Sequence, residues 1–232
     1  LASLLSIDSF FATNCTNTRK RPPPFLIGKG GQIQEWLIDW DSTVPRGVLY
    51  SPMYGLYPSA QIDPRSNTML ANAAKVFLGF RGDGEQGWPI AWRIGTWARL
   101  LDGNHAMTEV KLLLSDTGVY RSLLGKNIIF QIDANLGGTG TMIEMFLQSH
   151  NGILHILLAL PAELSQGTIT GLRARGGYTV NLSWNGGSLS QAVVMATIND
   201  AKTLEVRLGN STKNISLQLA KGASKTFTAS DF

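Results

Sequence analysis

The spacing of hydrophobic positions changes about two-thirds of the way along the chain. Up to about residue 149 it is mostly helical: Ile33, Trp36, Leu37 and Trp40 fall at i, i+3, i+4 and i+7, which predicts a helix with one buried face. The same spacing predicts four more helices, over residues 69–80, 88–101, 103–115 and 139–148. Segments rich in Pro, Gly and Asp separate them. The first part is therefore predicted to be helical, with irregular connections.

From about residue 153 the period of the pattern becomes two. Alternating apolar residues over 178–184 lead through the turn Asn185-Gly186-Gly187 into a second apolar run, 188–198, which predicts a β-hairpin. Short runs over 203–208, 215–219 and 225–228 extend the pattern. Helices followed by strands indicate the α+β class, with an antiparallel β-domain at the C-terminal end.

These changes predict three parts. Residues 1–24 fit neither pattern, because Ser, Thr and Asn dominate 9–18 and the run Arg21-Pro22-Pro23-Pro24 cannot be helical, so they are expected to form an irregular lead-in. Residues 25–152 form the helical part and 153–232 the β-domain.

Composition narrows the classes of protein. Of the 232 residues 44% are hydrophobic and 16% charged, which favours a folded globular chain. The net charge of +4 is scattered, so no nucleic-acid partner is expected. The apolar stretch 153–160 is far shorter than the roughly 20 residues of a membrane span, so no membrane is expected either. Cys15 has no partner for an intrachain disulfide, and N-x-[ST] triplets at Asn14, Asn181, Asn210 and Asn214 favour a secreted or extracellular protein.

Common catalytic motifs are missing from the sequence. His105, His150 and His155 lack the paired spacing of zinc hydrolases, so no metal is expected. There is no Gly-x-Ser-x-Gly, Walker or Gly-x-Gly-x-x-Gly motif, and no cofactor is expected. The segment Arg81-Gly82-Asp83-Gly84 is predicted to be a tight turn between two helices rather than an adhesion motif.

Asp133 is the carboxylate of most interest. It follows the apolar run 128–130, expected to be buried, and precedes Gly137-Gly138 and Thr139, which places it on a loop that enters a helix. Such a carboxylate could act as a general base or cap the helix, and both alternatives stay open. The many Trp and Tyr residues suit stacking on sugar rings. Core packing is the other explanation, favoured for Trp92 and Trp97.

Several motifs occur in the order and near the spacing of one known family. They are Gly31-Gln32-Ile33-Gln34-Glu35-Trp36, Tyr54-Gly55-Leu56-Tyr57-Pro58, Arg81-Gly82-Asp83-Gly84, Trp97-Ala98-Arg99-Leu100, Phe130-Gln131-Ile132-Asp133-Ala134-Asn135 and Gly171-Leu172-Arg173-Ala174-Arg175-Gly176-Gly177. Together they resemble the second half of the catalytic domain of the 1,2-α-L-fucosidases of glycoside hydrolase family 95.

The resemblance implies a partial (α/α)6 helical barrel followed by the family's β-domain. It also implies a glycoside hydrolase that removes terminal α-1,2-linked L-fucose from a fucosylated oligosaccharide or glycan with inversion. In the family an Asp at the position of Asp133 polarises the asparagines that hold the attacking water, so Asp133 is the expected catalytic residue. Asn135 and Trp88 are the weaker candidates for lining the sugar pocket, and Asp133 is expected to face Trp88 and the 50–58 loop.

The sequence also departs from the family pattern. The Ser-Pro-Glu-Asn-type segment with the general-acid Glu does not occur in it, and the family's His-Arg-His falls on Gly47-Val48-Leu49. Ala134 and Leu136 stand where Gly and Phe are usual. The isolated chain is therefore expected to be inactive, and to associate with the missing N-terminal part of the barrel or with itself. The alternative is a non-catalytic carbohydrate-binding or structural remnant of such an enzyme.

Overall fold

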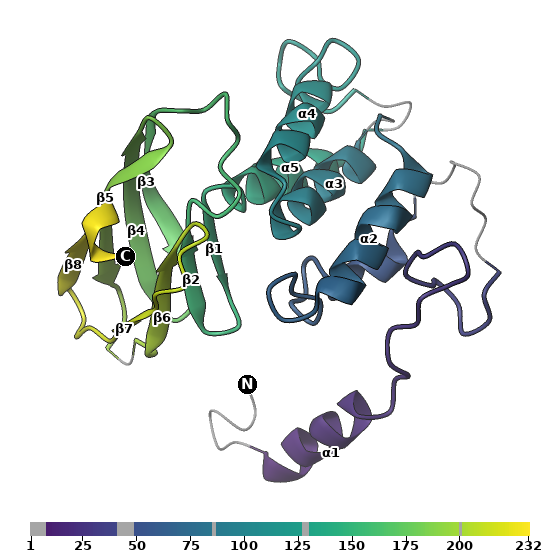
Figure 1. Cartoon of the computed structure of the whole chain (residues 1–232), viewed down its shortest axis with the longest axis horizontal. Coiled ribbons are helices and arrows are strands. Elements are labelled where there is room, and N and C mark those ends of the chain that lie inside the picture. Colours follow the sequence, from purple (N-terminus) through teal and green to yellow (C-terminus); the bar gives the residue numbers. More distant parts are fainter. Residues whose placement is uncertain (1–7, 41–48, 85–86, 127–129, 200) are drawn as a thin grey trace.

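A computed structural model describes residues 8–40, 49–84, 87–126, 130–199 and 201–232, and shows helices followed by strands (Figure 1). This order agrees with the α+β class. None of the helices in these ranges is long and apolar enough to cross a membrane. The helices are α1 (Ser9–Arg19), α2 (Thr68–Arg81), α3 (Trp88–Arg99), α4 (Gly103–Leu113) and α5 (Ile132–Ile143), with short 3-10 turns η1 (Ser51–Gly55) and η2 (Ala229–Asp231).

The predicted helices over 69–80, 88–101 and 103–115 are confirmed as α2, α3 and α4. Side chains cap α2 and α4. The Asn67 side chain accepts a hydrogen bond from the backbone N–H of Leu70, and the Asp102 side chain accepts one from the backbone N–H of His105. The turn predicted between α2 and α3 is also confirmed, since α2 ends at Arg81 and Gly82 has a φ of 72°.

The helix predicted over 33–40 is wrong. Gly31 turns the chain with a φ of 82°, and the following backbone pairs with the preceding segment: Ile33 forms a β-bridge with Ile27, and the Gln34 N–H donates to the Leu26 carbonyl at 2.9 Å. Ile33 is buried, but the side chains of Trp36 and Trp40 are 58% and 73% exposed. The helical spacing of these apolar residues does not produce a buried face.

The irregular structure predicted for residues 1–24 is wrong for 9–19, which form α1. Asp8 caps this helix by accepting the Phe11 N–H at 2.8 Å, and the hydroxyls of Thr13 and Thr16 donate to carbonyls four residues earlier. No residue of α1 is buried, and Figure 1 shows it standing apart from the other helices. Local hydrogen bonds rather than packing therefore form this helix.

The helix predicted over 139–148 begins and ends earlier, as α5. Gly137 and Gly138 lie inside it, where close packing explains their lack of a side chain: a Cβ on Gly138 would lie 2.6 Å from the Leu113 side chain. Asp133 is therefore in the first turn of α5 and not on a loop before it. Of the run 128–130, only Phe130 lies within the described residues, and it is exposed rather than buried.

The strands form two four-stranded sheets, in the orders β1-β2-β6-β7 and β3-β4-β5-β8. The predicted hairpin is confirmed as β4 and β5. The β part is not wholly antiparallel, because β2 and β6 run parallel. Between β2 and β6 in the sequence the chain forms β3, β4 and β5 of the other sheet. Strand β6 then pairs with β2 and runs in the same direction. The strands are β1 (Leu147–His150), β2 (Ile153–Ile156), β3 (Gly167–Ala174), β4 (Tyr178–Asn185), β5 (Ser188–Ala196), β6 (Leu204–Leu208), β7 (Ile215–Leu217) and β8 (Ser224–Phe227).

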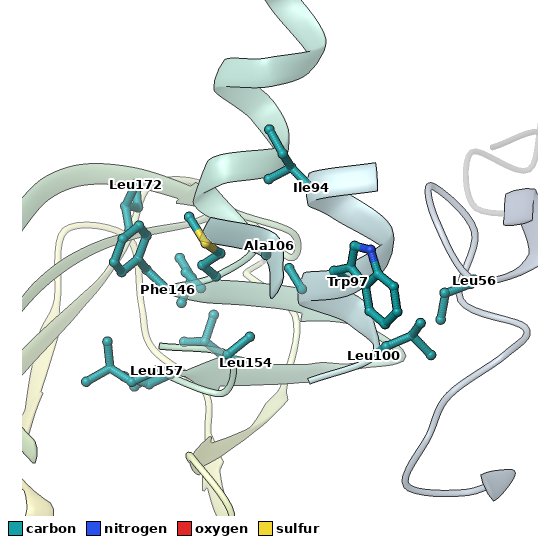
Figure 2. Close-up of a cluster of buried hydrophobic side chains, with 14 of the residues drawn as sticks. Leu56, Ile94, Trp97, Leu100, Ala106, Phe146, Leu154, Leu157 and Leu172 are labelled. Atoms are coloured by element: carbon teal, nitrogen blue, oxygen red, sulfur yellow. The ribbon is translucent and has the colours of Figure 1, made fainter. Parts of the chain in front are cut away.

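One hydrophobic core runs through the helical part and the β part. Trp97 and Ala106 from the helices belong to the same buried cluster as Phe146, Leu154 and Leu157 (Figure 2). Polar contacts cross the same junction, and the buried Gln148 side chain donates to the Ala98 carbonyl at 2.9 Å. The β part thereby fixes the ends of α3 and α5.

Candidate functional site

Helices α3 and α5 pack side by side and run in the same direction. A Cβ on Gly95 would lie 2.8 Å from the Thr141 side chain, and one on Gly137 would lie 3.4 Å from the Ala91 Cβ. The same sequence offset separates both pairs, as parallel helices require. Helix α4 runs antiparallel to α3, because Trp97 stacks on His105 while Arg93 pairs with Glu109. Small residues allow the close approach of α3 and α5.

This parallel packing brings Trp88 and Asp133 to the same end of the helix pair. Trp88 lies one turn before Ala91 in α3, and Asp133 lies one turn before Gly137 in α5. With a rise of about 1.5 Å per residue, the two positions are level to within about 2 Å along the helix axes. Two of the three predicted site residues therefore share one end of the α3–α5 helix pair.

Asp133 is exposed, and within the described residues it makes no hydrogen bond or ion pair. The N-cap of α5 is Gln131, so Asp133 does not cap the helix. An acidic residue in the first turn of a helix stabilises it by about 0.3–1 kcal/mol through the helix dipole. The capping alternative is thus wrong, and the carboxylate is accessible from solvent.

Trp88 stands at the edge of an aromatic cluster. Its ring meets Tyr50 edge-on at 6.3 Å and lies 5.7 Å from the ring of Trp92. The Trp92 indole N–H donates to the Tyr57 carbonyl at 2.8 Å. Trp92 packs against the core and Trp97 is buried, so core packing is confirmed for these two tryptophans. Trp88 is half-buried and packs against the core, so only part of its side chain is accessible to solvent.

Asn135 lies on another side of α5. It follows Asp133 by two residues, which is about 200° around a helix. Its side-chain oxygen accepts the Gly125 N–H at 2.9 Å, and its amide donates to the Leu123 carbonyl at 2.6 Å. It borders a mainly apolar cavity of about 230 Å³, whose lining includes Leu113, Val119 and Met142 but neither Trp88 nor Asp133. The structure therefore shows Asn135 holding the 123–125 segment against α5.

The variant Asn135→Ala is expected to lose about 1–3 kcal/mol of unfolding free energy, because it leaves the Gly125 N–H and the Leu123 carbonyl without their partner. Urea denaturation would measure the loss. Leu136→Ala, at an exposed position of the same helix, should change stability by less than about 0.5 kcal/mol. Equal stability of the two variants would contradict the anchoring role of Asn135.

A polar cluster away from Trp88 and Asp133 joins the helical part to the β part. Arg65 forms a bidentate pair with Asp63, with N–O distances of 2.8 and 2.7 Å. Arg65 Nη1 also contacts the ring nitrogens of His155, and Arg65 Nη2 lies 3.4 Å from His150 Nε2. Burial and the nearby arginines lower the pKa of each histidine to about 3. Both imidazoles are therefore neutral and can accept hydrogen bonds from Arg65.

Another polar cluster lies among α3, α4 and the turn after α2. Arg93 Nε is 2.8 Å from Glu109 Oε1, and both side chains are buried. Burial raises the pKa of Glu109 to about 8, with Asp83 raising it further and Arg93 opposing the shift. His105 Nε2 lies 2.8 Å from Asp83 Oδ1. Sequence reasoning missed this cluster because it searched for paired histidines, although His105 and Glu109 have i, i+4 spacing on one helix face.

The chain matches two family models along its length. Residues 1–146 match the Glycosyl hydrolase family 95 catalytic domain, and residues 148–230 match the Glycoside hydrolase family 95, C-terminal domain. Three curated proteins are also similar. They are Alpha-L-fucosidase 2 of Arabidopsis thaliana, 35% identical over 72% of this chain, and Probable alpha-fucosidase A of Aspergillus niger and of Aspergillus oryzae, 34% and 30% identical over 70% and 68% of it.

The matched regions make up only 21%, 23% and 26% of the lengths of these relatives, so the chain spans about a quarter of each.

Proposed function

Since the chain belongs to glycoside hydrolase family 95, we propose that it contributes one wall of the active site of an α-L-fucosidase. The proposed substrate is a fucosylated oligosaccharide or glycan with a terminal α-1,2-linked L-fucose. The similarity of the chain to curated alpha-fucosidases supports the fucosidase class, and inversion is what the family resemblance implies.

The observation that supports this proposal is the shared end of α3 and α5, where Trp88 and Asp133 are level. Inverting hydrolysis needs a proton donor on one face of the sugar and an activated water on the other. An exposed carboxylate without an internal partner, such as Asp133, is free to polarise the groups that hold that water. The accessible part of Trp88 offers an apolar surface for the sugar ring.

We propose that the proton donor comes from another part of the enzyme. The family's Ser-Pro-Glu-Asn-type segment does not occur in this sequence. Residues 47–48, where two positions of the family's His-Arg-His fall, lie outside the described residues. General acid catalysis typically supplies about 10² to 10⁴-fold in rate. We therefore propose that this chain does not turn over an α-1,2-fucosyl substrate unless the rest of the barrel is present.

A chimera tests the proposal. The chain would replace the matching region of Alpha-L-fucosidase 2 of Arabidopsis thaliana, and fucose release would be measured on α-1,2-, α-1,3- and α-1,4-linked substrates. Asp133→Asn is expected to lower kcat/KM on the α-1,2-linked substrate by about 10²-fold or more. Asp116→Asn, at another exposed carboxylate, should leave it within about two-fold.

Two results would overturn the assignment: full activity of the Asp133→Asn chimera, or release of fucose by the isolated chain that depends on Asp133. NMR of the first product anomer tests inversion separately.

We propose that another part of the enzyme covers the exposed tryptophans after Gly31. Trp36, Leu37 and Trp40 are all more than half exposed and lie within five residues of one another. Such patches promote association when nothing covers them. Light scattering of the isolated chain should therefore give a mass above 25.1 kDa that falls towards this value in Trp36→Ser/Trp40→Ser. A monodisperse monomer for the unmodified chain would contradict this expectation.

A further inference from the structure

Asp83, His105 and Glu109 direct their ligand atoms into one small volume. One nitrogen or oxygen from each lies within 4.8 Å of the other two. His105 and Glu109 are one turn apart on α4, and Asp83 reaches them from the turn after α2. The cluster therefore joins two elements that are about 20 residues apart in the sequence.

The cluster is pre-formed on a rigid base. The imidazole of His105 stacks on the Trp97 ring at 3.9 Å with an interplanar angle of 14°. Gly82 and Gly84 have φ values of 72° and 99° and turn the chain on both sides of Asp83. The stack orients the imidazole, and Asp83 Oδ1 lies 2.8 Å from its Nε2, so these two ligand atoms already face each other.

Glu109 contributes a buried carboxyl group that interacts with both Arg93 and Asp83. Its side chain is 0% exposed, and Arg93 Nε lies 2.8 Å from Oε1. Oε2 is buried and, within the described part of the chain, receives no hydrogen bond from an N–H group. Glu109 and Asp83 also interact through a side-chain hydrogen bond, which between two carboxyl groups requires a proton. A bound cation would replace this proton and hold both carboxylates together with His105.

We propose that Asp83, His105 and Glu109 form a binding site for a divalent transition-metal ion such as Zn²⁺. One imidazole nitrogen with two carboxylate oxygens suits zinc, whose ligands lie at about 2.0–2.2 Å and hence about 3–4 Å from each other. The observed separations, 2.8 Å for the His105–Asp83 pair and at most 4.8 Å, need only small side-chain rotations. Calcium and magnesium prefer all-oxygen sites and should bind much more weakly.

The metal would act as a clamp rather than as part of the sugar site. Its ligand His105 stacks on Trp97, nine residues after Trp88 in α3, which is about 13 Å along the helix. Solvent reaches the cluster because the side chains of His105 and Asp83 are 31% and 44% exposed. The ion would tie the turn that leads into α3 to α4, so the proposal does not depend on fucosidase activity.

Isothermal titration of the chain with ZnCl₂ at constant pH tests this site, using protein without a histidine tag. One Zn²⁺ per chain is expected, together with a rise in Tm of roughly 5 °C or more at saturation. CaCl₂ and MgCl₂ should produce neither effect. Co²⁺ offers a spectroscopic readout, because visible absorption bands report ligation by the imidazole and the carboxylates.

Single variants identify the ligands. Asp83→Asn, Glu109→Gln and His105→Phe, which keeps the stack on Trp97, should each weaken Zn²⁺ binding at least about ten-fold. Glu163→Gln alters a carboxylate of the nearby exposed pair with Lys111 and should have no effect, and neither should Cys15→Ser. Far-UV circular dichroism shows whether each variant folds.

Two outcomes would overturn the proposal. One is the absence of any zinc-dependent change in heat, Tm or cobalt spectrum. The other is binding that persists in folded His105→Phe or that disappears in Cys15→Ser.

Discussion

Acidification from pH 7 to about 4 is expected to lower the free energy of unfolding by several kcal/mol through His150 and His155. In the folded chain the pKa of each is about 3, whereas an unfolded histidine titrates near 6.5. Between these values the unfolded state binds more protons, so stability falls as the pH falls. Each histidine lowers the unfolding free energy by about 1.36 kcal/mol per pH unit below 6.5. At pH 4 the loss is therefore about 3 kcal/mol for each histidine.

Two other buried carboxyl groups contribute to the pH dependence with opposite signs. The hydrogen bonds and charge of Arg65 outweigh burial and lower the pKa of Asp63 to about 2, so its contribution to stability is lost as the pH falls below about 4. The pKa of Glu109, raised to about 8, has the reverse effect, because the folded state holds the extra proton between about pH 4.5 and 8. A histidine variant is therefore needed to isolate the histidine contribution.

Urea denaturation at pH 7 and pH 4.5 would measure this contribution in wild type and in His150→Gln/His155→Gln. Glutamine keeps an acceptor for Arg65 but does not titrate. The unfolding free energy at pH 7 minus that at pH 4.5 should be smaller by several kcal/mol in the double variant. Ser216→Gln, on an exposed position of the same sheet, should retain the wild-type difference. An unchanged difference in the histidine variant would show that these residues do not cause acid sensitivity.

Arg93→Met is expected to cost about 3–5 kcal/mol of unfolding free energy. The Arg93 side chain is 1% exposed, and its removal leaves the fully buried Glu109 without a cation and the Tyr50 hydroxyl without the N–H of Arg93. Because the pKa of Glu109 is raised to about 8, its carboxyl group is largely protonated at pH 7. The cost therefore comes from two buried polar groups that each lose a donor, at about 1–3 kcal/mol apiece. For a chain of this size the expected drop in Tm is roughly 10 °C.

The control for Arg93→Met is the exposed pair of Lys111 and Glu163, whose atoms approach to 2.6 Å but whose side chains are largely solvated. Lys111→Met should cost no more than about 1 kcal/mol. The double variant Arg93→Met/Glu109→Leu should recover much of the loss, because it replaces both partners of the buried polar pair with apolar side chains. Equal destabilisation by Arg93→Met and Lys111→Met would contradict a strong dependence on burial.

Hydrophobic spacing determines several elements of this protein directly. The patterns over 69–80, 88–101 and 103–115 predict α2, α3 and α4, and the alternation from Tyr178 predicts the β4–β5 hairpin. In these segments local propensity, capping residues and burial agree, so the neighbouring residues suffice. The family resemblance likewise rests on short ordered motifs and needs no coordinates.

Local patterns fail where a backbone partner elsewhere decides the outcome. The segment 33–40 has helical spacing, but its start pairs with residues 26–28 through a turn at Gly31. Gly137 and Gly138 predict an interruption before a helix, but both lie inside α5. They are glycines there because Ala91 and Leu113 pack close to their backbone. In each case the sequence shows the small residue but not the neighbour that requires it.

The sequence by itself determined the α+β class, most of the helices, the hairpin and the identity of Asp133 and Trp88 as candidate site residues. Only the tertiary structure decided that α3 and α5 run parallel, which brings these two residues to one end, and that Asn135 turns towards residues 123–125. It also decided that Arg65 meets His155, 90 residues away. Hydrophobic periodicity specifies which face of an element is buried, but the partner of that face depends on how all the elements stack together.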